Sequence, residues 1–471
     1  MGWLIYTSAV IIAHERGGQK LSEFSVPRIL LYYAPMINRR FALAMLPALA
    51  LLLLALLSGC SGLTPRLPER ITQRAPAWLL PKPAPPPMAL SVWAWSESEV
   101  ADKWLRDQID AFIQERAAIA EPLTVTLSLL PDYPAALDEL AADALTGTRP
   151  DLLLLDLYRL PYMQAAGALQ PLPAQALFAD DLYPQLRDGA RVGGELYCLP
   201  FEVNTLALIY NRTLFNAAGI TYPSAGWTWT EMEAAAAAIS ALPTDHFTAY
   251  GLVLPVDMTR WLPWLTAAGG RVVDDAGAPA LEAVSAREAI STYVELITQG
   301  PAVEPGHLEA SWGGEALGIG RVGMTLEGNW VMPYLATEHP NTDAAVAPLP
   351  GPGVAFATCW AITSRDPDRR TAAVDLLARL TAPGALDRRM TTTAAIPARP
   401  SLASAWRTRY PAWSPFLDGI DQAQLWQLPA DLMGLPRVFN RALRAVIDGD
   451  ETAADMSAQI LDAMQSMQRE E

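Results

Sequence analysis

The chain alternates between short apolar runs and segments with helical periodicity. In its first part, apolar runs at 90–93, 123–130 and 151–156 predict strands, and the periodic segments at 99–116 and 134–145 predict helices. The run at 151–156 is so apolar that both of its faces must be buried, as happens in parallel sheets. Strand, helix, strand, helix, strand is typical of an α/β fold with crossover connections.

The same alternation returns further along the chain. Strands are expected at 250–254 and 322–326 with a helix at 286–298 between them, and a helix at 368–380 and a helical tail at 437–467 follow. No repeat of fixed period is visible. Because 471 residues are too many for one compact domain, we expect more than one α/β unit.

An uncharged apolar segment precedes these patterns. Arg39 and Arg40 are followed by the apolar run 41–57, which is short for a membrane span, and by small residues before Cys60. The string Leu57-Ser58-Gly59-Cys60 resembles a bacterial lipobox, in which the cysteine is lipidated and becomes the new N-terminus. We therefore predict a lipoprotein signal peptide over 36–60. The alternative is a transmembrane anchor that ends in an unmodified cysteine.

A signal peptide is expected at the very start of a chain, but residues 1–35 would precede this one. They place the charged residues Glu15, Arg16 and Lys20 ahead of the positive segment at Arg39 and Arg40. We interpret 1–35 as a misassigned extension and expect the chain to start at Met36. The alternative is an unusually long positive segment.

A proline-rich segment follows Cys60. Residues 61–88 end in the string P-K-P-A-P-P-P before Met88 and favour extended polyproline II over helix or central strand. Such a tether would separate a lipid-bound cysteine from a folded body, and lasting attachment would need more than one acyl chain. We expect an exported protein, anchored to the cell membrane by lipid and facing the periplasm or the cell exterior.

Composition narrows the classes of function. Hydrophobic residues make up 51% of the chain and charged residues 18%, which supports a large core. The formal net charge of -16 disfavours a nucleic-acid binder, because such proteins neutralise phosphates with a basic patch. An acidic, self-repelling surface is the plain interpretation of this charge.

Motifs of catalysis and metal binding are missing from the sequence. It contains no H-E-x-x-H, no G-x-S-x-G and no glycine-rich phosphate loop. Glu97 and Glu99 could in principle form a glycosidase dyad, but acidic pairs arise by chance in so acidic a chain. The four histidines are isolated from one another: His14, His246, His307 and His339. We expect no catalytic residue, no metal and no cofactor.

Three consecutive segments carry a more specific pattern. They read E-L-Y-C-L-P at 195–200, L-I-Y-N-R-T-L-F-N-A-A-G-I at 208–220 and W-T-E-M at 229–232. In this order they resemble the family 1 extracellular solute-binding proteins of ABC importers, the group that includes maltose-binding protein. Further matches in the same order lie at 151–156, 167–169, 267–270, 320–324, 328–330, 348–351 and 396–397. No single motif is decisive, but together they cover roughly residues 90–467.

The resemblance implies a two-lobed periplasmic-binding-protein fold, in which hinge strands join two discontinuous lobes. It assigns 88–203 and 356–402 to lobe 1, and 204–355 and 403–471 to lobe 2. It also implies that a solute lies between the lobes, which close on it by hinge motion.

Two positions depart from the family pattern. Thr358-Cys359 stands where the family often has a glycine pair, and Leu317 where an aromatic residue is usual. The resemblance places the strand that carries Cys198 beside the strand that carries Cys359. A disulfide is permitted in an oxidising compartment. Two separate buried thiols are the alternative, and we leave both open.

Candidate binding residues follow from position and from the resemblance. A sugar presents apolar faces on which aromatic rings stack, and hydroxyls that planar polar side chains bind. The chain has 15 tryptophans, and an arbitrary one belongs to the core. Trp330 matches the family tryptophan that stacks on the ligand. Trp95 and Glu97 follow the first strand, at the end where open α/β sheets bind ligands, and there a structural role is equally plausible.

Further candidates lie at comparable positions. Tyr158 and Arg159 follow the strand at 151–156, and Arg159 is either a fork donor to ligand hydroxyls or one half of a surface salt bridge. Asn204 lies where the family crosses between lobes. Asp257 and Trp261 lie in the segment that contributes contacts from the second lobe.

These expectations together describe a substrate-binding lipoprotein that captures a mono- or oligosaccharide and delivers it to ABC permease subunits. We expect a monomer that binds the membrane only through its lipid anchor. The alternatives are a secreted glycan-active hydrolase and a ligand-sensing lipoprotein.

Overall fold

The computed structural model describes residues 88–143, 149–173, 179–243, 247–274, 277–281 and 284–469. The expected signal peptide, its Cys60 and nearly all of the tether lie outside the described residues. Among the helices that the structure describes, none is both long enough and apolar enough to cross a membrane.

The chain enters the fold through the predicted strand–helix–strand unit. Strand β1 (Met88–Ala94) lies between β2 (Leu123–Leu129) and β3 (Leu152–Asp156), and all three are parallel. Helix α3 (Glu99–Ala118) connects β1 to β2, and the side chain of its N-cap Ser98 accepts the backbone N–H of Ala101. Trp104, Leu105, Ile109 and Phe112 of α3 are buried, as its periodicity predicts. The predicted α/β class is therefore confirmed.

One long strand joins this unit to the rest of the sheet. Strand β6 (Cys198–Asn211) pairs through its first part with antiparallel β11 (Val354–Ile362), which also pairs with β3. Its second part pairs with β9 (Val322–Gly328) and β10 (Ala344–Ala347). The strand order β2-β1-β3-β11-β6-β9-β7-β8 makes β6 the link between the two ends of the sheet.

The far end of the sheet is again parallel. Strand β9 pairs with β7 (Tyr250–Val253), and β7 pairs with β8 (Ala302–Val303). Helix α8 (Trp229–Ser240) packs so closely on β7 that a side chain at Gly251 would overlap the backbone of Ala236.

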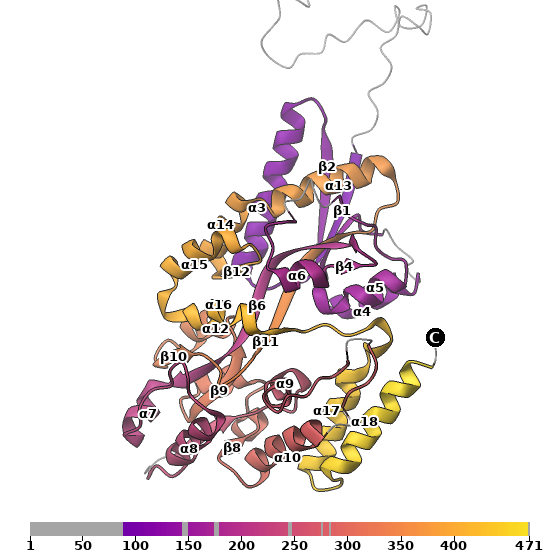
Figure 1. Cartoon of the computed structure of the whole chain (residues 1–471). Coiled ribbons are helices and arrows are strands. Elements are labelled where there is room, and N and C mark those ends of the chain that lie inside the picture. The colour runs from indigo at the N-terminus through magenta and orange to yellow at the C-terminus, as the bar shows by residue number, and fades with distance from the viewer. Residues whose placement is uncertain are drawn as a thin grey trace, which may run out of the picture. The chain divides into compact units, whose positions relative to one another are not determined.

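Two hydrophobic cores form around these strands. The first contains side chains of β1, β3 and α3 together with α13 (Pro367–Leu380) and α14 (Pro383–Thr393). The second contains α8 and α10 (Val284–Thr298) together with α17 (Leu435–Ile447) and α18 (Ala453–Met467). Figure 1 shows α3 and α13 beside β1 and β2, and α17 and α18 at the opposite end of the described fold. Strand β6 contributes Leu199 to the first core and Leu208 to the second.

The segment that follows residue 402 still packs in the first core. Trp406, Phe416 and Ile420 are each 0% exposed and belong to the first core, although they lie beyond residue 402. Strand β13 (Gln424–Leu425) then pairs with β11, and Trp426 is the first residue of this stretch in the second core.

The remaining elements are short. The α-helices are α4 (Tyr133–Ala141), α5 (Leu160–Ala165), α6 (Pro184–Gly189), α7 (Arg212–Ala218), α9 (Met258–Ala267), α11 (Gly313–Gly318), α12 (Val331–Glu338), α15 (Ala403–Arg409) and α16 (Ser414–Asp418). The strands are β4 (Arg191–Val192), β5 (Glu195–Leu196) and β12 (Ile396–Pro397). The 3₁₀-helices are η1 (Leu157–Arg159), η3 (Pro305–Leu308), η4 (Pro400–Leu402), η5 (Pro411–Trp413), η6 (Ile420–Gln422) and η7 (Ala430–Leu432).

Candidate ligand-binding site

The carboxyl ends of β1 and β3 bring several expected residues to one edge of the sheet. Trp95 and Glu97 directly follow β1, Asp156 ends β3, and η1 carries Tyr158 and Arg159. Because β1 and β3 are parallel neighbours, these residues share the edge at which open α/β sheets bind ligands.

Asp156 is the chemically most distinctive residue at this edge. Its side chain is exposed and has no hydrogen-bond or ion-pair partner among the described residues. The surrounding protein nevertheless removes much of its solvation, which raises the pKa of Asp156 to about 6, with a smaller rise from Glu97 and an opposing effect of Arg159. A ligand hydroxyl could supply the missing hydrogen bond. Sequence reasoning passed over Asp156, although a carboxylate at the end of an apolar strand was a visible signal.

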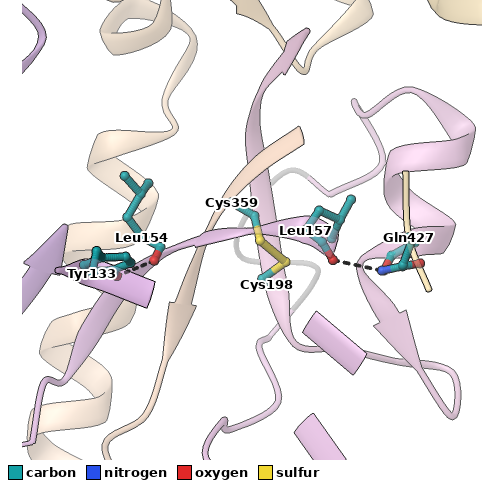
Figure 2. The surroundings of a disulfide bond; sticks show 7 residues. Tyr133, Leu154, Leu157, Cys198, Cys359 and Gln427 are labelled. Atoms are coloured by element: carbon teal, nitrogen blue, oxygen red, sulfur yellow. Dashed lines mark hydrogen bonds between the residues drawn. A yellow bond between two sulfur atoms is a disulfide. The ribbon is translucent and has the colours of Figure 1, made fainter. Parts of the chain in front are cut away.

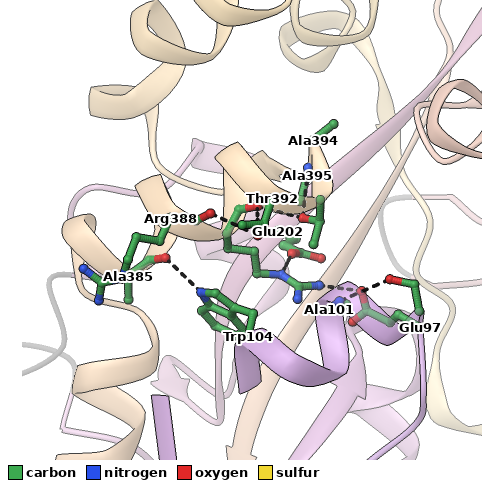
Figure 3. A network of polar contacts seen from close by, with 12 residues as sticks. Glu97, Ala101, Trp104, Glu202, Ala385, Arg388, Thr392, Ala394 and Ala395 are labelled. Atoms are coloured by element: carbon green, nitrogen blue, oxygen red, sulfur yellow. Dashed lines mark hydrogen bonds and ion pairs between the residues drawn. The ribbon is translucent and has the colours of Figure 1, made fainter. Parts of the chain in front are cut away.

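A buried ion network lies beside this edge. The guanidinium of Arg389 in α14 forms ion pairs with both Glu97 and Glu202, and the Arg389 side chain is 4% exposed (Figure 3). Its guanidinium carbon lies 4.9 Å from the ring centre of Trp104 and 5.2 Å from that of Phe201. The network therefore fixes the Glu97 carboxylate, so that Glu97 has a structural partner as well as a place at the sheet edge.

A small pocket opens beside the network. Its lining includes Trp95, Glu97, Trp104, Trp360 and Arg389, and its volume is only about 10 Å³, which is room for a single water molecule in this conformation. The ring of Trp95 meets that of Tyr133 at 65° with ring centres 5.4 Å apart. An aromatic wall beside carboxylates is the combination that polyol recognition requires.

Trp330 approaches from the other end of the sheet. It lies two residues after the end of β9, at the N-cap of α12, and packs against both hydrophobic cores. Its Nε1 donates to Glu327 Oε2 at 3.2 Å, and the guanidinium carbon of Arg260 lies 5.6 Å from its ring centre. Phe356 of β11 meets the ring at 67° with ring centres 5.8 Å apart. Trp330 therefore lies at the junction of the two cores and is held by contacts that the sequence did not predict.

Asn204 links the two halves of the site. It lies on β6 opposite Phe356, which contacts Trp330, and two residues after Glu202, which contacts Arg389. Asn204 is half-buried, and its side chain makes no hydrogen bond to the described part of the chain. These contacts place Trp95, Glu97, Asp156, Asn204 and Trp330 in one neighbourhood, which we call the candidate site.

Tyr158 and Arg159 make protein contacts instead of pointing freely into this neighbourhood. Arg159 Nη1 lies 2.9 Å from Asp138 Oδ1, which is the salt bridge that the sequence left as an alternative. Tyr158 stacks on Trp426 with ring centres 5.5 Å apart and planes 13° apart, and its hydroxyl donates to the carbonyl of Met433 at 3.1 Å. Burial raises the pKa of Tyr158, so its hydroxyl remains a proton donor at neutral pH.

Asp257 and Trp261 have clear structural roles in α9. Asp257 is the N-cap, and its carboxylate accepts the backbone N–H of Arg260 at 3.1 Å. Trp261 is 0% exposed and packs on Phe439 of α17 with ring centres 4.5 Å apart. The helix turns the Trp261 side chain into the second core, so this structure gives it a packing role.

Cys198 and Cys359 are joined in a disulfide, one of the two alternatives left open by the sequence (Figure 2). Their Cα atoms are 5.7 Å apart, well within the range for a disulfide. The bridge links β6 to β11 within the first core.

The chemistry of the candidate site is that of binding. It combines aromatic rings, carboxylates and an amide, which suit the apolar faces and hydroxyls of a sugar or polyol. Among the described residues, no group of three or more histidines, cysteines or acidic residues could hold a metal ion.

Comparison with known proteins agrees with the fold. The sequence pattern of a bacterial extracellular solute-binding protein family matches residues 111–415. The mannitol-binding protein of Pseudomonas aeruginosa is 39% identical over 92 residues, which cover 19% of this chain and 21% of that protein. A putative binding protein of Brucella abortus (strain 2308) is 27% identical over 245 residues, which cover 50% of this chain and 58% of that protein. The chain thus matches about a fifth of the first relative and less than two thirds of the second.

Solved structures resemble the chain over most of its length. An ABC substrate-binding protein of Listeria monocytogenes in complex with cycloalternan has a TM-score of 0.70 and 20% identity, covering 81% of this chain and 99% of that chain. A solute-binding protein of an ABC transporter from Thermotoga lettingae, bound with α-D-tagatose, has a TM-score of 0.69 and 19% identity, with the same coverage. At these identities the likeness establishes a shared two-lobed fold.

Proposed function

This chain belongs to the bacterial extracellular solute-binding proteins, and from that premise we propose that it captures a neutral sugar or polyol at the candidate site. The observation that carries the proposal is the exposed Asp156 carboxylate, which has no hydrogen-bond or ion-pair partner in the described part of the chain and lies in one neighbourhood with Trp95 and Trp330. Sugar hydroxyls would satisfy the carboxylate, and the rings would cover the apolar face of the sugar. The mannitol, cycloalternan and tagatose named for its relatives belong to this class of solute.

We further propose that the two cores are two lobes that close on the solute, and that the closed form is delivered to the permease of an ABC importer. Support comes from the two-lobed fold shared with the solved structures and from β6, whose side chains enter both cores. The expected lipid anchor at Cys60 and the proline-rich tether would keep the folded body beside the membrane.

Thermal unfolding in the presence of candidate solutes tests the proposal. Mannitol, tagatose and maltotetraose should each be added in excess, because a ligand that binds only the native state raises its melting temperature. At a concentration 100 times the dissociation constant the stabilisation is about 2.7 kcal/mol. The variant Asp156→Ala should lose the shift while it remains folded.

The alternatives give different results in the same samples. A glycan hydrolase would release products from maltotetraose on incubation, whereas a binding protein returns it unchanged. If no neutral sugar or polyol raises the melting temperature of the wild type, the proposed solute class is wrong.

A further inference from the structure

Glu327 is a buried carboxylate that contacts Trp330 of the candidate site and Arg260 of α9 at once. It is 1% exposed on β9, three residues before Trp330. Its Oε2 accepts Trp330 Nε1 at 3.2 Å and lies 2.7 Å from Arg260 Nη2. A carboxylate buried in this way is costly unless such partners compensate it, so its presence calls for a role.

The surroundings leave the Trp330 ring little freedom. A side chain at Gly328 would overlap the ring, so the ring lies directly against the backbone at this glycine. The Arg260 guanidinium lies over the ring, 5.6 Å from its centre. Arg260 is itself held, because its Nη1 donates to Thr259 Oγ1 at 2.9 Å. Of these contacts, the one to Glu327 is the hydrogen bond of the indole N–H, so it sets the direction in which this edge of the ring points.

The first turn of α11 makes room for this carboxylate. A side chain at Gly313 would come within 2.9 Å of Glu327 Oε1 and would also overlap Thr325 Oγ1. Glycine at this position therefore lets α11 pack closely around Glu327. Burial raises the pKa of Glu327, whereas Arg260 and the Trp330 N–H oppose the rise by stabilising the charged form.

We propose that Glu327 is a positioning residue of the binding site: it fixes the rotation of the Trp330 ring and ties it to Arg260, so that the stacking surface exists before the solute arrives. The inference rests on the proposed function for its consequence in binding, but the positioning itself exists in the empty protein. Preformed stacking surfaces cost less ordering entropy on binding than mobile ones.

The first experiment needs no ligand. In ¹⁵N-labelled protein the indole N–H resonance of Trp330 is identified as the one missing from Trp330→Phe. In Glu327→Gln this resonance should move, and its N–H should exchange with solvent about tenfold faster, because a hydrogen bond to a charged acceptor has become one to a neutral group. An unmoved resonance with unchanged exchange would refute the positioning role.

The second experiment measures binding, first with mannitol and then with maltotetraose. Glu327→Gln should weaken the binding of whichever probe the wild type retains by about tenfold to a hundredfold. In the Trp330→Phe background, which lacks the indole N–H, the same change should cost much less. Equal losses in both backgrounds would show that Glu327 does not act through Trp330.

A matched control separates positioning from general stability. Asp151 is also a buried carboxylate, 2% exposed, but it pairs with Arg369 and the backbone N–H of Ser91, away from Trp330. Asp151→Asn should lower the melting temperature without moving the Trp330 resonance or the affinity. If Glu327→Gln does not fold, Glu327→Asp is used for the same measurements. It keeps the negative charge, but its side chain is one methylene shorter, so the carboxylate oxygens lie further from Trp330.

The two proposals fail in different ways. If neither probe binds the wild type, the proposed solute class falls, and the resonance of Trp330 still decides the role of Glu327. If a probe binds and Glu327→Gln changes neither the resonance nor the affinity, the positioning role falls and the proposed function stands.

Discussion

Cys198 and Cys359 lie on neighbouring antiparallel strands with Cα atoms 5.7 Å apart, but the two residues are not directly opposite each other in the ladder. Cys359 pairs with Pro200 and Cys198 pairs with Ala361, so the bridge runs diagonally across the ladder. A register shift follows at once, because Thr358 pairs with Glu202. The bridge therefore holds the two strands together where their regular pairing is interrupted.

The disulfide gives the first prediction. It closes a loop of 161 residues, and the chain-entropy account then assigns it up to about 5 kcal/mol of stability, from which any native strain subtracts. Cys198→Ala with Cys359→Ala should lower the free energy of unfolding, measured by urea titration, by at most this amount. The unreduced wild type, denatured and treated with a thiol reagent, should show neither cysteine free. Two reactive thiols there would contradict the bridge.

Trp330→Ala should weaken ligand binding while the fold survives. Stacking on an aromatic ring contributes on the order of 1–3 kcal/mol, so the binding free energy measured by calorimetry should become less favourable by roughly this amount. Trp227→Ala is the matched control, because Trp227 packs on Phe215 in the second core and should leave the affinity unchanged. Wild-type affinity in Trp330→Ala would remove Trp330 from the site.

Asp156 should make stability depend on pH. Because the fold raises its pKa from 3.8 to about 6, the folded state disfavours the ionised form. The protonated Asp156 side chain makes its full contribution to stability below about pH 4, and this contribution is lost as the pH rises through about 6. Asp156→Asn should therefore raise the melting temperature at pH 8 and give no advantage at pH 3.5. Since the group is exposed, we expect only about 1 kcal/mol.

The control for this change is Asp107→Asn, which removes the same charge from the exposed face of α3. An equal gain in both variants at pH 8 would attribute the effect to net charge. A gain for Asp156→Asn that persists at pH 3.5 would mean that titration of this carboxyl is not its cause.

Arg389 should be important for stability. Arg389→Met would leave Glu202, which is 6% exposed, as a buried charge without its partner, and such losses cost about 3–5 kcal/mol. Adding Glu202→Gln should recover part of this loss in urea denaturation at pH 7. Arg407→Met, which breaks the exposed pair with Asp418, should cost no more than about 1 kcal/mol. A single variant as stable as the double would contradict the account.

Processing at Cys60 is the last prediction. Intact-mass analysis of protein extracted from membranes should show an acylated species that begins at Cys60. Cys60→Ser should release the protein from the membrane fraction or leave it unprocessed. A mature wild-type protein that still contains Arg39 and Arg40 would exclude a cleaved lipoprotein signal.

Helices could be predicted where the residues that indicate them lie in or next to the helix itself. The helix expected at 99–116 is observed at Glu99–Ala118, and the helix expected at 368–380 at Pro367–Leu380, since apolar period and N-caps lie within each segment. The helical tail at 437–467 is in fact two helices. Gly449 has φ +82°, and Thr452 with Asp455 forms a capping box that starts the second one. Those break signals were legible in the sequence.

The candidate site was only half predictable. Trp95 and Glu97 were expected because they follow the first strand, and Trp330 because it matches the stacking tryptophan of the resembled family. Their partners were not, because Arg389 is 292 positions from Glu97, and only the folded chain brings the two together. Trp330 and Trp261 also cannot be told apart by residue type. Which one is exposed depends on α17, which covers Trp261 with Phe439.

Strand β6 has a mechanical consequence for any motion between the two cores. A single continuous strand carries hydrogen-bond ladders to β11 and then to β9, with Thr205 the last residue of the first ladder and Leu206 the first of the second. If one core slid past the other, the hydrogen bonds of both ladders would break. Bending or twisting β6 between the two ladders breaks neither set of hydrogen bonds. The disulfide ties β6 to β11 on one side of this point, so the proposed closure would pivot at Thr205–Leu206, directly beside Asn204. A solute held at Asn204 would then lie close to the axis of rotation. The groups around the solute would rotate during closure but would move only a short distance.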